Sequence, residues 1–207
     1  EMINHIELIW DDIDKWWNEK NIKSVRDEFC SKYWEWREIN SKFFLTHFEN
    51  SPNRVKNWFL DEVIGDNSRK AYMVIDLRGT LIGVCGFKNL LAGEVELDTM
   101  MRGRSSGHPE IMISAQRALV WYLFSEVGVK VIFGKVLSKN VLVRFFHKQF
   151  GFVEIRRLPL IRKRYHKSTE LVVTEQLDDL AEELIEIKLT EGSYRSSFKP
   201  YEWPAFS

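Results

Sequence analysis

The fold of this chain is decided by the stretch Asp98-Thr-Met-Met-Arg-Gly-Arg-Ser-Ser-Gly-His-Pro-Glu110. Side chains alternate in character along residues 94–101, which predicts a strand that leads into this stretch. A polar loop with two glycines follows, and Pro109 then suits the first position of a helix. A strand, a glycine-containing loop and a helix start in this order can direct backbone N–H groups toward a bound diphosphate. An ordinary connection between a strand and a helix has the same sequence character, so both interpretations stay open.

The chain before this strand is predicted to begin with helices. Apolar residues recur at spacings of three and four over residues 3–17, and Phe29, Tyr33 and Trp36 continue a second stripe after Ser24. Ser51-Pro52 offers a third helix a capping hydroxyl and a proline at its first position. These aromatic stripes are expected to pack in the core, with a dimer surface or a wall for an aromatic acceptor as the alternative.

The rest of the chain is predicted to be a sheet with further helices. The expected strands are 71–77, 80–87, 94–101, 130–137, 151–157 and 170–175, and the expected helices begin at Pro109 and Asn140. An acidic helix is expected around Asp178 to Ile187, followed by an aromatic tail over 194–206. This order predicts one α/β domain with a mixed sheet flanked by helices.

Composition excludes several classes of protein. The 207 residues carry 30 Lys and Arg against 30 Asp and Glu, so a protein that coats nucleic acid through bulk charge is not favoured. Cys30 and Cys85 are too few for a disulfide framework, and the five histidines lack metal-ligand spacing, so no metal is expected. No apolar run reaches the ~20 residues of a membrane span and no signal-peptide pattern is visible, so we expect a cytoplasmic protein without membrane attachment.

Two motifs resemble the signatures of the GNAT acetyltransferase superfamily. Arg104-Ser-Ser-Gly-His-Pro109 resembles its Arg/Gln-x-x-Gly-x-Gly/Ala loop, and Asn140-Val-Leu-Val-Arg-Phe-Phe-His-Lys-Gln-Phe-Gly-Phe152 resembles its Asn-x-x-Ala-x-x-Leu-Tyr-x-x-x-Gly-Phe helix. The helix after Ser51 is similar to the branch that includes ribosomal-protein and amino-sugar acetyltransferases. The resemblance implies a GNAT-like mixed, splayed β-sheet flanked by helices over residues 37–176. It leaves an aromatic N-terminal helical extension at 1–36 and an acidic helix with a C-terminal tail at 177–207.

The resemblance also implies acetyl-CoA as co-substrate and assigns residues to it. The loop residues expected to hold the pyrophosphate are Arg104, Ser105, Ser106, Gly107 and His108. The backbone of Thr99 to Met101 is expected to hold the thioester oxygen, and Asn140 to position the pantetheine arm. Pro109 departs from the family loop, because proline removes one backbone donor from the diphosphate site.

The resemblance implies direct attack of an amine on the acetyl thioester, and a base has to deprotonate that amine. Glu94, Glu96 and Asp98 share one face of their strand, and Glu96 is the preferred base with the other two as rivals. A solvated strand face is the alternative explanation. His147 stands where many relatives have the tyrosine that protonates the CoA thiolate, and an imidazolium could donate that proton. An ordinary helix-surface histidine is the alternative.

The acceptor is expected to enter between the first helices and a basic segment at 156–167, where Arg162, Lys163 and Arg164 would bind it. A solvated charged face is the alternative. The predicted function is acetylation of a primary amine on a small molecule, a carbohydrate or a phosphate-bearing acceptor such as a nucleotide-linked amino sugar or modified nucleic acid. The alternatives are a protein N-terminal or lysine acetyltransferase and a catalytically degenerate CoA-binding module. Monomer and homodimer both stay open.

Overall fold

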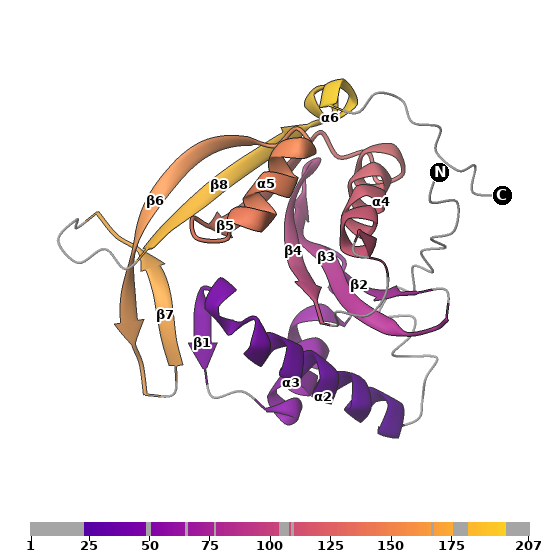
Figure 1. The fold of residues 1–207 in the computed structure, drawn as a ribbon, viewed down its shortest axis with the longest axis vertical. Coiled ribbons are helices and arrows are strands. Elements are labelled where there is room, and N and C mark those ends of the chain that lie inside the picture. The colour runs from indigo at the N-terminus through magenta and orange to yellow at the C-terminus, as the bar shows by residue number, and fades with distance from the viewer. Residues whose placement is uncertain are drawn as a thin grey trace.

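The structure is a computed structural model that describes residues 23–48, 51–64, 66–76, 78–103, 108, 110–166, 168–175 and 182–197. Its centre is an eight-stranded mixed sheet with the strand order β1-β7-β6-β8-β5-β4-β3-β2 (Figure 1). The strands are β1 (Thr46–Phe48), β2 (Lys70–Ile75), β3 (Leu81–Leu91), β4 (Glu94–Arg102), β5 (Val131–Leu137), β6 (Val153–Arg164), β7 (Ser168–Val173) and β8 (Glu182–Thr190). The helices are α2 (Lys23–Ile39), η1 (Ser41–Phe43), α3 (Pro52–Trp58), η2 (Phe59–Val63), α4 (Ile111–Ser125), α5 (Val141–Gln149) and α6 (Glu191–Ser197).

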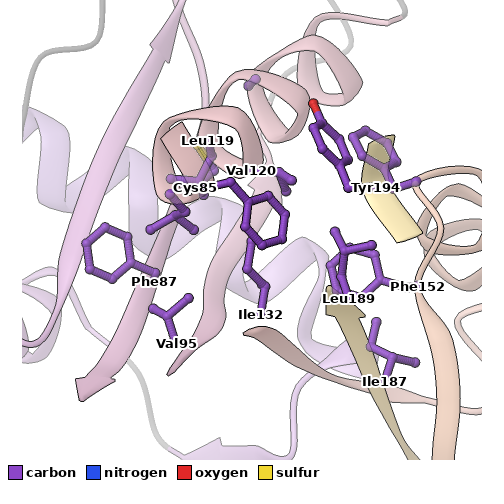
Figure 2. Close-up of a cluster of buried hydrophobic side chains, with 14 of the residues drawn as sticks. Cys85, Phe87, Val95, Leu119, Val120, Ile132, Phe152, Ile187, Leu189 and Tyr194 are labelled. Atoms are coloured by element: carbon purple, nitrogen blue, oxygen red, sulfur yellow. The ribbon is translucent and has the colours of Figure 1, made fainter. Parts of the chain in front are cut away.

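Helices cover both faces of the sheet, and the alternation of β2 shows which helix covers which face. Tyr72 and Val74 belong to a buried cluster with residues of α4, whereas Ala71 and Met73 belong to a second cluster with α2 and α3. Successive side chains of a strand point to opposite faces, so α4 packs on one face and the pair α2 and α3 on the other. Figure 2 shows the first cluster, in which β4, β5 and β8 contribute side chains below α4.

The first two described helices form where the sequence predicted them. In α2, Phe29, Tyr33 and Trp36 are buried at spacings of four and three. The Ser51 hydroxyl accepts a hydrogen bond from the backbone N–H of Arg54 at 3.2 Å, and the proline at 52 begins α3. None of the described helices combines the length and the apolar character needed to cross a bilayer.

The predicted α/β class and the mixed, splayed sheet are confirmed, with one strand that the sequence analysis missed. That strand is β1, which pairs with β7 in antiparallel fashion. β6 is longer than expected, since it runs to Arg164 and pairs with β8 over its first part and with β7 over its last part. The predicted segment 1–22, the loop 104–107, Pro109 and the tail after Ser197 lie outside the described residues.

The acidic helix expected around Asp178 to Ile187 is wrong, because Glu182–Thr190 form strand β8. Ile185, Ile187 and Leu189 alternate and point into the buried cluster of Figure 2. β8 lies between β6 and β5, so the central sheet extends beyond residue 176. The acidic side chains that suggested a solvated helix form cross-strand ion pairs instead, as between Glu186 and Arg156 at 2.7 Å.

Candidate active site

The two central parallel strands separate halfway along their length. β4 and β5 pair only at Glu94 with Val131, Val95 with Ile132 and Glu96 with Phe133. β4 then continues to Arg102 and β5 to Leu137 without further pairing to each other. Backbone N–H and C=O groups inside a protein need partners, so the facing edges of these two strands form a site for a ligand with amide groups.

The open part of β4 contains a distorted residue. Thr99 has a φ of 55°, and the pairing with β3 shifts between Val84 and Gly86, opposite this residue. A positive φ is unusual for a β-branched residue, so the bulge at Thr99 is a local strain held by its surroundings. Such a bulge turns the peptide groups of the predicted thioester-binding segment Thr99 to Met101 out of the regular ladder.

The three acidic residues of β4 have different surroundings. Glu96 lies at the last paired position before the strands part, and its carboxylate contacts Lys135 Nζ at 3.1 Å and Lys88 Nζ at 3.5 Å. Asp98 contacts Lys88 Nζ at 3.3 Å and lies 4.0 Å from the Arg69 guanidinium. The Glu96 and Asp98 side chains are only 13% and 21% exposed, whereas Glu94 is exposed. The face is therefore a charge network and not a freely solvated surface.

The sequence analysis did not include the lysines that hold Glu96. Lys88 and Lys135 are the only charged residues of β3 and β5, which are otherwise made of apolar residues, glycine and Asn89. A single charge in a strand of this kind is a signal for a partner or a site. Within the described ranges, no group of three or more His, Cys, Asp or Glu side chains is arranged to hold a metal ion.

His147 lies in the core and not on the surface of α5. Its ring packs on Phe152 at 5.0 Å between centroids, and its buried Nδ1 has no hydrogen-bond partner. Burial lowers the pKa of His147 to about 4. At pH 7 only about one ring in a thousand carries the extra proton, so an imidazolium donor is scarce. This argues against the imidazolium role that the sequence suggested.

The described residues at the two ends of the open strands fit acetyl-CoA. The Asn140 side chain accepts a hydrogen bond from Val143 N at 3.4 Å and so caps α5 at its start. His108 is exposed, and its Nδ1 accepts from the backbone N–H of Glu110 at 3.2 Å, directly before α4 begins at Ile111. Unpaired strand edges can take the amides of the pantetheine arm, and the start of a 15-residue helix can take a diphosphate. The other predicted loop residues, 104–107, lie outside the described part of the chain.

The predicted basic loop is mostly strand. Arg162, Lys163 and Arg164 are exposed residues at the end of β6, and the turn to β7 begins only at Tyr165. Two earlier arginines of this segment are paired with acids: Arg156 with Glu186, and Arg157 with Glu154 and Glu183. The charge available to an acceptor is therefore smaller than the sequence suggested.

Comparisons with known proteins identify the family. A family model described as an acetyltransferase (GNAT) domain matches residues 14–153. The fold is similar to the spermidine N-acetyltransferase from Vibrio cholerae in complex with CoA and spermine, with a TM-score of 0.63 and 17% identity over 84% of this chain and 94% of that chain. Mutant forms of the spermidine/spermine N-acetyltransferase SpeG from the same organism give 0.61 and 12% over 91% and 96%.

A dodecameric structure of the Vibrio cholerae spermidine N-acetyltransferase gives a TM-score of 0.58 and 15% identity over 86% of this chain and 95% of that chain. No curated protein sequence matches the chain. At identities this low, the structural likeness establishes the fold, and the family model, which spans more than half of the chain, establishes the family. The chain belongs to the GNAT family of acetyltransferases and is an N-acetyltransferase with acetyl-CoA as its acetyl donor.

Proposed function

We propose that the chain acetylates the primary amine of a small, phosphate-bearing molecule, such as a nucleotide-linked amino sugar. The observation that carries this proposal is the separation of β4 from β5 directly after Glu96, on the face covered by α2 and α3. The thioester enters between the parted strands, and the amine approaches from the face on which Glu96 lies. A carboxylate at that junction is within the reach that proton transfer from an incoming ammonium group requires.

Each residue then has a specific role in the transfer. Glu96 takes the proton from the ammonium group, directly or through one water molecule, and the freed nitrogen lone pair attacks the carbonyl carbon of the thioester. Lys88 and Lys135 hold the Glu96 carboxylate in place. Backbone N–H groups in the segment Thr99 to Met101 donate to the thioester oxygen as its negative charge grows. The C–S bond breaks and the sulfur leaves with the electron pair.

The leaving thiolate needs little help from an acid. A thiol has a pKa of about 8.5, so its thiolate is a stable leaving group near neutral pH. The buried, neutral ring of His147 can donate a hydrogen bond but has no surplus proton to transfer. We therefore assign His147 at most a hydrogen-bonding role toward the sulfur.

A polyamine acceptor, as named for the Vibrio cholerae enzymes, is less compatible with the charges of this chain. A polycation needs free carboxylates, but Glu96 and Asp98 already contact Lys88, Lys135 and Arg69. The surface near these carboxylates also carries the cations of α2, α3 and β6. These charges favour an acceptor with a negative group beside its amine.

The test is thiol release from acetyl-CoA with a panel of amines. The panel contains phosphorylated and neutral amino sugars, spermidine, and peptides with a free N-terminus or lysine. We expect turnover with small amines and highest kcat/KM for phosphorylated ones. Turnover restricted to peptides would replace the proposal with protein acetylation, and acetyl-CoA binding without turnover on any amine would indicate a degenerate CoA-binding module.

A further inference from the structure

A pocket lies where the C-terminal end of α2 meets β1. Its volume is about 170 Å³, room for several water molecules at roughly 30 Å³ each or for one phosphoryl group. Arg37, Phe44, His47 and Phe48 line it, and the acidic lining residue Glu38 is exposed. The pocket therefore combines aromatic walls with cationic side chains.

Arg37 is a cation without a carboxylate partner. Its guanidinium lies over the rings of Phe44 at 4.2 Å and Phe48 at 4.8 Å, and Nη2 donates to the carbonyl oxygen of Thr46 at 3.3 Å. In the described part of the chain no acid forms an ion pair with it, and burial lowers its pKa from the ordinary value. A charge removed from water without a counter-ion is unfavourable, so an anion in the pocket would offset a cost that the protein already carries.

Further cations act on the same pocket. Arg54 of α3 lies 3.8 Å over the Phe48 ring, so this ring is held between two guanidinium groups. Burial lowers the pKa of His47, and the positive charges of Arg162, Lys139 and Arg37 lower it further. Lys139 is paired with Glu182 at 2.7 Å, whereas Arg162 is exposed at the end of β6. The potential in the pocket is therefore positive.

The pocket lies beside the acetyl-transfer site. The residue before Arg37, Trp36, packs on Gly103 at the end of β4, and Asn40 Nδ2 donates to the Arg102 carbonyl oxygen at 3.4 Å. Asp98 of the β4 charge network is among the charges that act on Arg37. In Figure 1 the end of α2 and β1 lie together next to the open part of the sheet.

We propose that this pocket, with Arg37 at its base, binds the phosphoryl group of the acceptor and thereby selects phosphate-bearing amines over polyamines. The inference rests on the proposed function and adds the subsite that determines its substrate class. Arg37 and Arg54 supply the donors to the phosphoryl oxygens, while the amine of the same molecule extends toward Glu96. A guanidinium matches phosphate geometry with two parallel donors, which a lysine cannot supply.

The first test measures binding and needs no acceptor. Inorganic phosphate is titrated into the full chain at constant ionic strength with saturating CoA, so that the diphosphate site is filled, and thermal unfolding is followed. We expect Tm to rise by roughly 3–5 °C at ten times the Kd of phosphate. Arg37→Gln should abolish this rise and Arg54→Gln should reduce it, while Arg78→Gln, a change of an exposed arginine in the β2–β3 turn, should keep it. If Arg37→Gln is too unstable to assay, the exposed Arg54 gives the result.

The second test measures selectivity. Wild-type kcat/KM is compared for glucosamine 6-phosphate and glucosamine, and we expect a preference of about 10- to 100-fold for the phosphorylated amine. The preference should disappear in Arg37→Gln and persist in Arg78→Gln. Turnover of glucosamine and spermidine with no phosphate preference, and no effect of Arg37→Gln, would refute the pocket and leave the proposed acetyltransfer to amines intact. Absence of turnover with every amine would refute the proposed function itself, while the phosphate titration would still decide the pocket.

Discussion

At the scale of single residues, neighbours decide what a carboxylate can do. Glu94, Glu96 and Asp98 share one strand face in the sequence, but only Glu96 lies at the point where β4 and β5 part. Its two lysine contacts fix the carboxylate without closing the site, since its side chain remains 13% exposed. Position along the strand therefore separates three residues that the sequence could only rank.

Glu96→Gln tests the assignment of the base. The amide cannot accept the proton of the ammonium group, so we expect kcat to fall by about 100- to 10,000-fold while the KM for acetyl-CoA changes little. Glu94→Gln on the same strand face is the matched control and should retain activity. A rate within threefold of wild type for Glu96→Gln, together with a large loss in Asp98→Asn, would move the base to Asp98.

The buried ring of His147 predicts a pH dependence of stability. Its pKa is lowered from the ordinary 6.5 to about 4 in the folded protein, so between these pH values the unfolded chain binds the additional proton. Stability that is present above pH 6.5 is therefore lost as the pH falls toward 4, by up to about 3 kcal/mol. Urea unfolding of His147→Phe should lose this component, whereas His166→Phe, at an exposed position, should keep it. Equal pH dependence in all three proteins would contradict the burial of the ring.

At the scale of elements, close contact between α2 and β4 links the acceptor pocket to the open strand. A Cβ atom placed on Gly103 would meet the Trp36 ring at 1.8 Å, so helix and strand touch without room for a side chain. Trp36 precedes Arg37, so the position of the pocket depends on this contact. Glycine at 103 is required by packing and not by an unusual φ.

Gly103→Ala should therefore destabilise the protein. The added methyl group has to displace Trp36, which we expect to lower the free energy of unfolding by roughly 1–3 kcal/mol. Gly192→Ala in α6 is the matched control, because nothing lies within 4 Å of the place that its methyl group would take, and alanine should leave stability unchanged or raise it. Denaturant unfolding curves compare the two variants. Equal stability of Gly103→Ala and wild type would mean that α2 is not held against β4 in this way.

Asn140 combines a structural and a predicted binding role that two variants separate. Asn140→Ala removes the cap on α5 and should cost about 1 kcal/mol, whereas Asn140→Asp retains a capping oxygen. If the side chain also positions the pantetheine arm, both variants should raise the KM for acetyl-CoA. An unchanged KM in both would limit Asn140 to capping.

Elements with local signals were predictable from the sequence, and elements that depend on distant partners were not. The cap at Ser51 and the hairpin of β2 and β3 are local, and both form as expected. β8 was mistaken for a helix because its acidic residues find their partners elsewhere, as Glu182 does with Lys139 on the segment after β5. Arg37 carried no sequence signal at all, because its significance comes from the rings of Phe44 and Phe48.

At the scale of the whole molecule, the two faces of the sheet divide the work. α4 and α5 pack over a continuous core on one face, which fixes β4 and β5 at their paired end (Figure 2). On the other face, α2 and α3 pack only against β2, β3 and the end of β4. The acetyl donor and the acceptor can therefore reach the same point between the parted strands from different sides.

Hydrogen exchange of the full chain with and without acetyl-CoA tests the role of the parted strands most directly. Amides of residues 97–102 and 134–137 that face the gap have no partner across it in the free protein. We expect acetyl-CoA to slow exchange in both segments together, because the pantetheine arm supplies the missing partners. Tight binding of acetyl-CoA with unchanged exchange in both segments would contradict a donor site between β4 and β5.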